Sequence, residues 1–276
     1  MNSPAPQAAL QELVAQLQLE QLEKNLFRGV STDIGAPAVF GGQVLGQALM
    51  AAARTVDGHA AHSLHGYFLR AGDKTAPIVY DVDRIRDGAG FTTRRVVAIQ
   101  HGEPIFHMSA SFQRREEGVS HQRAMPDAPL PEGLGPRAGP RIDVEGPIEF
   151  RHVDPRDPMT AGPRPPASQT WLRAAGALPD DPLLHQAMLA YASDYSFMGV
   201  AMQPHGLAFQ QPGVQAVSLD HAMWFHRDFR CDDWLLYDTE SPSAEHARGF
   251  CRGALFDRAG RLVASVAQEG LIRVRR

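Results

Sequence analysis

The sequence predicts an α+β fold built from two similar halves, each with one buried helix and a set of antiparallel strands. First, residues 46–50 are matched by residues 185–189, and strand-like runs follow both segments. Second, residues 41–55 are apolar nearly all the way round, which is typical of a helix with no side facing solvent. Third, apolar and polar residues alternate along 104–113, with the period of two that marks a half-buried strand.

The first half begins with a predicted amphipathic helix over residues 8–24, because Leu10, Leu13 and Leu17 recur at helical spacing. The apolar helix over 41–55 follows it. Glycine-containing turns then separate several apolar runs, which favours antiparallel neighbours. The strands that we expect cover 62–70, 77–86, 91–101 and 104–113.

The second half repeats this order after a stretch of different composition. Eleven of the 21 prolines lie between Pro126 and Pro166, which predicts a linker or an irregular covering loop. Within it, residues 148–151 are a candidate start for the second sheet. Asp181 followed by Pro182 indicates the beginning of a helix that runs to residue 193. The strands that we expect after it cover 214–225, 233–241, 246–257 and 261–273.

These elements divide the chain into a first repeat over 1–115, a Pro/Gly-rich linker over 116–166 and a second repeat over 167–276. The polar repeat residues also correspond by spacing. Ser218 and Gln268 are separated by 50 positions, as are Ser63 and Gln113 in the first half. This spacing predicts that the two pairs occupy equivalent places.

The composition describes an ordinary soluble protein. The 276 residues are 43% hydrophobic and 21% charged with a net charge of −4, and nucleic-acid binding proteins are usually basic. No run approaches the roughly 20 apolar residues of a membrane span, and the polar N-terminus lacks the pattern of a signal peptide. The two cysteines, Cys231 and Cys251, favour buried thiols in a reducing compartment. We therefore expect a cytoplasmic protein with no nucleic-acid or membrane partner.

Three polar residues of the second half are the candidate catalytic group: Asp194, Ser218 and Gln268. Alignment of the two apolar helices places Thr55 opposite Asp194, so only the second half has the carboxylate. A carboxylate can act as general base toward a water that a hydroxyl and an amide hold against a carbonyl carbon. Each residue alone has a simpler explanation, a helix cap for Asp194 and solvent-facing strand positions for the other two.

Other chemistries lack their motifs. No Gly-x-Ser-x-Gly elbow and no His-Glu-x-x-His occur, and the glycine spacing before Gln47 has neither the lysine nor the hydroxyl residue of a phosphate loop. His62 with His65, and His221 with His226, are possible metal pairs, but strand or core histidines explain them more simply. We expect neither a metal nor a cofactor.

Four further residues are candidates for oxyanion or substrate binding. Gly42 and Gln43 lie at the start of the apolar helix, where free N–H groups can bind a developing negative charge. His65 and Arg70 lie on and just after the first predicted strand, and a solvated surface explains an arginine there equally well.

Several long motifs, in order, resemble the bacterial acyl-CoA thioesterase II family over nearly the whole chain. They are Leu26-Phe27-Arg28-Gly29, Val39-Phe40-Gly41-Gly42-Gln43-Val44-Leu45-Gly46-Gln47-Ala48, Tyr67-Phe68-Leu69-Arg70-Ala71-Gly72-Asp73, Arg94-Arg95-Val96-Val97-Ala98-Ile99-Gln100, Tyr191-Ala192-Ser193-Asp194, Asp220-His221-Ala222-Met223-Trp224-Phe225-His226-Arg227 and Gln268-Glu269-Gly270.

The resemblance implies a double hotdog fold, an apolar acyl channel near the two helices, a homo-oligomer and hydrolysis of medium- to long-chain acyl-CoA without a covalent intermediate. It also implies an Asp/Thr/Gln triad, which falls on Asp194, Ser218 and Gln268 in this sequence. Ser218 departs from the family by keeping the hydroxyl without the methyl group that stiffens threonine. The sequence does not specify the preferred chain length.

Two other functions remain open from the residues alone. A hydratase of the same fold would aim a carboxylate and a histidine at an alkene, but Asp220 and His221 are adjacent and would point to opposite faces of a strand. A non-enzymatic acyl-CoA sensor would need no group that activates water, so the three polar residues argue against it.

Overall fold

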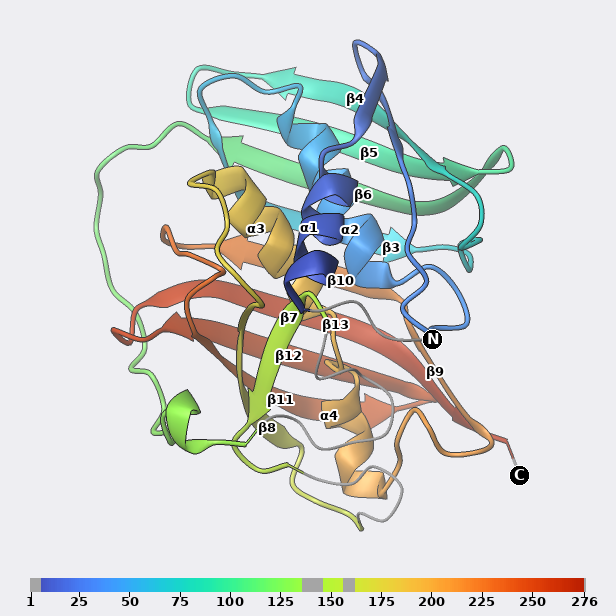
Figure 1. The fold of residues 1–276 in the computed structure, drawn as a ribbon, viewed down its shortest axis with the longest axis vertical. Helices are drawn as coiled ribbons and strands as arrows, with labels where there is room; N and C mark the ends of the chain where they lie inside the picture. The colour runs from blue at the N-terminus through green and yellow to red at the C-terminus, as the bar shows by residue number, and fades with distance from the viewer. Residues whose placement is uncertain (1–5, 136–145, 156–161, 276) are drawn as a thin grey trace.

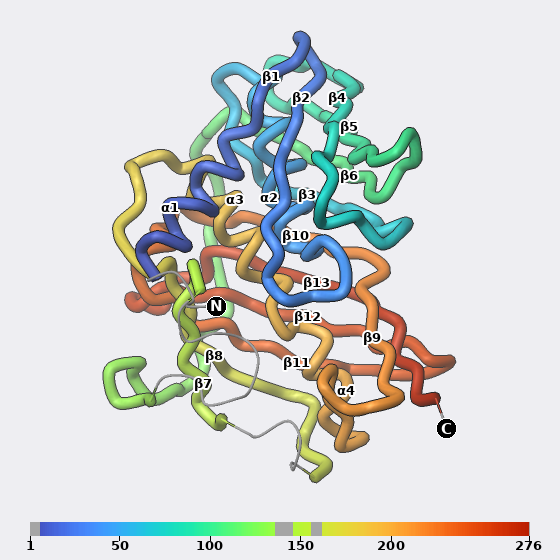
Figure 2. The backbone as a smooth tube through the Cα atoms, turned by 45° about the vertical axis from the view of Figure 1, so that its right-hand side comes forward, coloured from blue at the N-terminus to red at the C-terminus, as the bar shows by residue number. Residues whose placement is uncertain are grey.

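The computed structural model describes residues 6–135, 146–155 and 162–275, which form one large antiparallel sheet with helices against one face (Figure 1). Along the sheet the strands are ordered β1-β2-β4-β5-β6-β3-β10-β13-β12-β11-β8-β7, and β9 also pairs with β13. The two halves meet where β3 pairs with β10, and the outer strands β1 and β7 lie at opposite ends (Figure 2). The predicted α+β class with two sheet-and-helix halves is confirmed.

The first half contains the predicted elements and one additional hairpin. Its elements are α1 (Pro6–Leu17), β1 (Glu20–Glu23), β2 (Leu26–Gly29), α2 (Gly41–Ala53), β3 (Ala60–Phe68), β4 (Ile78–Asp87), β5 (Phe91–Gln100) and β6 (Glu103–Gln113). The prediction of one helix over 8–24 was too long. The helix ends at Leu17 because the following residues pair with β2, where Glu20 lies opposite Arg28 and forms an ion pair with it.

The second half begins inside the proline-rich range. Its elements are η1 (Pro131–Gly133), β7 (Ile148–His152), β8 (Ala167–Ala174), α3 (Pro182–Ser193), α4 (Gly199–Met202), η2 (Gln203–His205), β9 (Val214–Ser218), β10 (Asp220–Phe225), β11 (Leu235–Glu245), β12 (Arg248–Asp257) and β13 (Leu262–Val274). Sequence reasoning missed β8. It also predicted one strand over 214–225, where the chain forms two strands separated at Leu219. Residues 136–145 and 156–161 of the predicted linker lie outside the described residues.

The two central helices pack closely because α2 has glycines where it meets α3. A Cβ atom on Gly42 would lie 2.3 Å from the Tyr191 carbonyl oxygen, and one on Gly46 would lie 3.0 Å from that of Ala187. Such contacts exclude any larger residue from both positions without a shift of the helices. They bring the N-terminal end of α2 beside the C-terminal end of α3.

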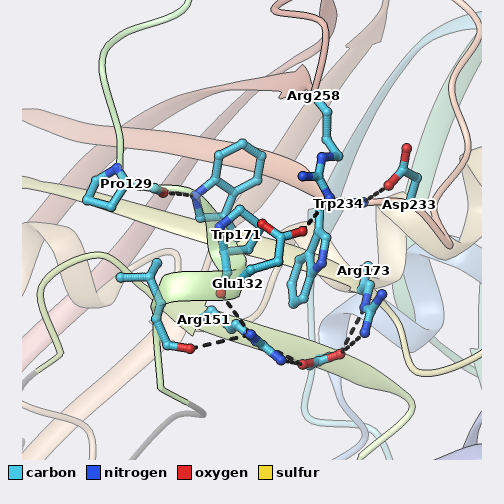
Figure 3. A network of polar contacts seen from close by, with 11 residues as sticks. Pro129, Glu132, Arg151, Trp171, Arg173, Asp233, Trp234 and Arg258 are labelled. Atoms are coloured by element: carbon cyan, nitrogen blue, oxygen red, sulfur yellow. Dashed lines mark hydrogen bonds and ion pairs between the residues drawn. The ribbon is translucent and has the colours of Figure 1, made fainter.

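Residues 125–135 of the proline-rich range cover the outer face of the second half of the sheet, on the side away from the central helices. The indole N–H of Trp171 donates to the Pro129 carbonyl oxygen at 2.8 Å, and Arg151 donates to that of Pro131 at 2.7 Å (Figure 3). The guanidinium of Arg173 lies over the ring of Trp234, 4.4 Å from its centre. This part of the proline-rich segment is therefore packed against the sheet as a cover. Among the described residues, no helix is long and apolar enough to span a bilayer.

Candidate active site

The structure brings Asp194, Ser218 and Gln268 together around one amide group. Gln268 Nε2 donates to Asp194 Oδ1 at 3.1 Å and to Ser218 Oγ at 2.5 Å. The two hydrogens of the amide thus hold a carboxylate and a hydroxyl next to each other. Gln268 is only 1% exposed, so these bonds form in a site largely closed to bulk water.

Asp194 is the C-cap of α3, as its place at the end of the apolar helix predicts. A carboxylate there opposes the dipole of its own helix. Its second oxygen, however, faces the beginning of α2, because a Cβ atom on Gly41 would lie 2.8 Å from Asp194 Oδ2. The N-terminal end of α2 offers free N–H groups and a favourable dipole to this carboxylate. The close packing of the two helices therefore accommodates a charge that α3 alone would disfavour.

A β-bulge at Leu219 aims Ser218 into the site. Ser218 lies opposite Gly270, and Ala222 lies opposite Ala267. Three residues therefore separate the first members of these pairs, whereas only two separate their partners on β13. The extra residue reverses the alternation of side chains along the strand. Ser218 consequently shares the inner face with Gln268, and a regular strand over 214–225 would have placed it on the other face from His221.

His221, which sequence reasoning weighed only for a metal pair and for a hydratase, completes the cluster. His221 is fully buried, and its Nδ1 lies 3.0 Å from Gln268 Oε1. Its Nε2 lies 3.0 Å from the Oγ of Ser193, the last residue of α3. Burial lowers the pKa of His221 below 6.5, which keeps the ring neutral at physiological pH, although nearby Asp194 acts in the opposite direction. The missing signal was the bulge, because Ser218 and His221 are three residues apart.

Of the four candidates for oxyanion or substrate binding, Gly42 and Gln43 lie in the first turn of α2, the helix whose first residue faces Asp194. Gly42 is the second residue of α2 and faces Tyr191. The buried side chain of Gln43 supports the preceding loop, since it accepts from the Thr32 N–H at 3.2 Å and donates to Ser31 Oγ at 3.1 Å. Gly41, which the sequence pairs with Gly42 before the apolar helix, lies against Asp194, because a Cβ atom on it would lie 2.8 Å from Asp194 Oδ2.

The other two lie elsewhere. His65 is half-exposed on the outer face of the sheet, where its Nε2 lies 3.0 Å from Asp220 Oδ2. Arg70 is exposed and contacts the Pro104 carbonyl oxygen and Glu103 at the surface. Neither side chain is part of the cluster around Gln268.

The possible metal pairs do not converge. His62 Nε2 lies 2.8 Å from Ser111 Oγ, and His226 Nε2 lies 2.8 Å from Ser265 Oγ. Their expected partners, His65 and His221, contact Asp220 and Gln268 instead. The explanation as strand and core histidines describes all four.

The spacing-based match between the halves needs correction. Gln113 lies on the outer face, where it donates to Glu116, and its buried neighbour Phe112 points inward. Both halves carry a register shift in their central hairpin, after Ala98 in the first half and after Leu255 in the second.

At these shifts, Ala98 pairs with Phe106 and Leu255 pairs with Ala264, so Phe106 and Ala264 are equivalent. Ala110 follows Phe106 by as many residues as Gln268 follows Ala264, and the two therefore occupy the same position. Ala61 lies opposite Phe112 and therefore corresponds to Ser218. Leu64, opposite Ala110, then corresponds to His221. The equivalent pair in the first half is therefore Ala61 and Ala110, which are 49 positions apart, and the equal spacing of 50 between Ser63 and Gln113 was a coincidence.

Two family models match the chain: "Acyl-CoA thioesterase" over residues 148–271 and "Acyl-CoA thioesterase N-terminal domain" over residues 29–113. The chain belongs to the acyl-CoA thioesterase family. It is 38% identical to acyl-CoA thioesterase 2 of Haemophilus influenzae, over 96% of this chain and 98% of that protein. It is 43% identical to human acyl-coenzyme A thioesterase 8, over 94% of this chain and 88% of that protein.

Solved structures agree with this membership. The acyl-CoA thioesterase II TesB2 from Mycobacterium marinum has a TM-score of 0.82 and 48% identity, over 97% of this thioesterase and 99% of that chain. A hot dog fold protein of unknown function from Alicyclobacillus acidocaldarius has a TM-score of 0.83 at 19% identity, which supports the fold alone. The predicted double hotdog fold and thioesterase II family are confirmed.

Proposed function

We propose that this thioesterase hydrolyses medium- to long-chain fatty acyl-CoA through a water activated by Asp194, Ser218 and Gln268. The observation that carries the proposal is the double donation from Gln268 Nε2 to Asp194 Oδ1 and Ser218 Oγ. Because Asp194 has two oxygens and one of them receives this bond, the carboxylate keeps acceptor capacity for a water proton. Ser218 Oγ accepts from Gln268, so its own hydrogen is available to the same water.

The reaction needs no covalent intermediate. The water oxygen attacks the thioester carbonyl carbon while its proton passes to Asp194. The tetrahedral intermediate then collapses with cleavage of the C–S bond, and the leaving sulfur takes up the proton. The products are a free fatty acid and the thiol of CoA, and Asp194 returns to its ionised form.

The beginning of α2 supplies the groups that suit the developing oxyanion. Gly41 and Gly42 are the first residues of α2, and backbone N–H groups in the first turn of a helix have no partner within it. Preorganised donors of this kind contribute about 3–4 kcal/mol to many acyl-transfer reactions. Apolar groups flank the site, with the Phe68 ring 3.0 Å from a Cβ position on Gly41 and Met198 packed against Gly270. Such apolar surroundings suit the hydrocarbon chain of an acyl substrate.

The rival reactions fit the geometry less well. Asp220 and His221 point to opposite faces of β10, since Asp220 contacts His65 on the outer face and His221 is buried with Gln268. A hydratase that uses this pair would need both on one side. A sensor without turnover would bind acyl-CoA tightly and release no thiol.

The decisive experiment compares thiol release from a series of acyl-CoA chain lengths by wild type and Asp194→Asn. We expect kcat to fall about 10²- to 10⁴-fold in the variant, because asparagine cannot accept the water proton. Asp228→Asn is a matched control at an exposed carboxylate that pairs with Arg115 on the surface. Equal rates for Asp194→Asn and wild type would remove Asp194 from the mechanism, and loss of an enoyl-CoA substrate without thiol release would favour the hydratase.

Ser218→Thr restores the residue that the family resemblance implies, and we expect it to keep activity because the hydroxyl is retained. The cytoplasmic location and the homo-oligomer stay predictions. Fractionation of the native host and light scattering of the purified protein would test them.

A further inference from the structure

We propose that His221 is a positioning residue for the reaction: its Nδ1–H fixes the side-chain amide of Gln268 in the one orientation that serves both Asp194 and Ser218. This inference rests on the proposed function of the Asp194, Ser218 and Gln268 cluster. It assigns a part to a buried histidine that the proposed water-activating group does not include.

The first step of the argument concerns the Gln268 amide, which has two ends of opposite hydrogen-bonding character. The atom that lies 3.1 Å from Asp194 Oδ1 must be the nitrogen, because an ionised carboxylate oxygen only accepts hydrogen bonds. A rotation of the amide by half a turn would put two acceptor oxygens against each other and would remove the donor to Ser218 Oγ. The catalytic arrangement therefore requires Gln268 Oε1 to face away from Asp194, toward His221.

The second step follows from the first. Gln268 Oε1 can only accept, so the His221 nitrogen that lies 3.0 Å from it must carry a hydrogen. A neutral imidazole has one N–H, which is then on Nδ1 and leaves Nε2 as an acceptor. Ser193 Oγ, 3.0 Å from Nε2, supplies a hydroxyl that can donate to it, although the Ala190 carbonyl oxygen lies 2.9 Å from the same hydroxyl. The acceptor oxygen of Gln268 thereby selects the tautomer of His221, with its hydrogen on Nδ1.

The third step is the comparison with the first half. Leu64 occupies the place that corresponds to His221, and Ala110 the place that corresponds to Gln268. The same strand position thus accepts a leucine where there is no amide to orient. Burial of an imidazole costs free energy because its nitrogens lose their hydrogen bonds to water, and burial of a leucine has no such cost. Packing alone therefore does not account for a fully buried histidine at this position.

The proposal is tested with His221→Leu and His221→Asn. Asparagine places its Nδ2 close to the position of the imidazole Nδ1 and keeps the donor to Gln268, whereas leucine reproduces the first half and removes it. We expect His221→Leu to lower kcat about 10- to 100-fold with little change in KM, because the amide is released while the acyl-binding surface is intact. His221→Asn should recover most of the loss.

A double-mutant cycle separates this role from a general loss of packing. In a Gln268→Ala background the additional His221→Leu change should lower kcat less than about twofold, since no amide remains to be oriented. Equal losses in both backgrounds, or no recovery by His221→Asn, would overturn the proposal. Absence of thiol release from wild type would instead overturn the proposed function. Thermal denaturation of each variant confirms that the compared proteins are folded.

Discussion

The two halves of this thioesterase share their strand pairing, their register shifts and a buried central helix, and they differ in the side chains at equivalent inner positions. Three such pairs are apolar in the first half and polar in the second: Ala61 and Ser218, Leu64 and His221, Ala110 and Gln268. The same fold therefore forms whether these positions carry apolar or polar side chains. What makes the second half chemically competent is a small set of polar side chains placed on it.

The first half also buries polar groups, but it uses them differently. The side chain of Arg94 is 1% exposed, and its Nε donates to Thr55 Oγ1 at 2.7 Å. Its other nitrogens donate to the carbonyl oxygens of Thr55, Arg86 and Thr93 and to the carboxylate of Asp87. Every nitrogen of this guanidinium is thus bound within the protein. Such a group ties the end of α2 to the sheet, whereas Asp194 and Ser218 keep capacity for a water.

The largest expected effect comes from giving the second half the residue of the first. Gln268→Ala removes the amide that joins Asp194 and Ser218, and we expect kcat to fall about 10²- to 10³-fold. The variant should still fold, because Ala110 fills the corresponding place in the first half, but it should denature at a lower temperature, since buried His221 and Asp194 lose a hydrogen-bond partner. The measurement is thiol release together with thermal denaturation.

Gln113→Ala is the matched control, since spacing alone would equate Gln113 with Gln268. Its side chain lies on the outer face, so its kcat should equal that of wild type. A loss similar to that of Gln268→Ala would contradict the correspondence between the halves.

The next prediction concerns Arg94, the buried polar side chain of the first half. Arg94→Met leaves the buried hydroxyl and carbonyl groups around Arg94 without their donor, and we expect the free energy of unfolding to fall by about 3 kcal/mol. Its kcat should not change, because Arg94 is in the half without the polar trio. Urea denaturation and thiol release measure the two quantities. Arg95→Met is the control, where an exposed pair with Asp83 should contribute less than about 1 kcal/mol. A strong loss of kcat in folded Arg94→Met would show that the halves are not independent.

A smaller effect is expected at the contact between the two halves where Gly41 of α2 faces Asp194. Gly41→Ala puts a Cβ atom 2.8 Å from Asp194 Oδ2 and 3.0 Å from the Phe68 ring. We expect this displacement of the carboxylate to lower kcat about tenfold. Gly90→Ala adds the same methyl group where nothing lies within 4 Å, and it should behave as wild type. Full activity in Gly41→Ala would mean that the carboxylate tolerates displacement from the beginning of α2.

Much of the architecture follows from local patterns in the sequence. The apolar helices, the cap at Asp181 and most strands were predicted because each depends on residues close together in the chain. Residues of the candidate trio were recognised by type and by resemblance, and the structure brings them into contact. Their roles stay predictions until variants are measured.

The remaining features depend on register, which has no local signature. The bulge at Leu219 is visible only as a change in pairing with β13, yet it decides on which face of the sheet the Ser218 side chain lies. The place of His221 in the cluster follows from that bulge, and a strand read with a strict period of two does not reveal it. Strand β8 was missed because it follows a proline-rich stretch and lies in a sheet position set by distant β11.

The smallest effect concerns stability against pH and again compares His221 with Leu64. Burial lowers the pKa of His221 in the folded protein below the 6.5 of an unfolded histidine. As pH falls below 6.5, the unfolded chain binds a proton that the folded protein does not bind, so the free energy of unfolding decreases by at most about 1.4 kcal/mol per pH unit. The decrease ends when pH reaches the folded pKa. His221→Leu removes this contribution and should show a shallower loss of stability in urea denaturation as pH falls below about 6.5. Buried His185 has a lowered pKa of the same sign in both proteins, so the difference in slope isolates His221. Identical slopes would mean that the folded protein protonates His221, as an imidazolium 4.0 Å from Asp194 would allow, and the neutral tautomer would then be wrong.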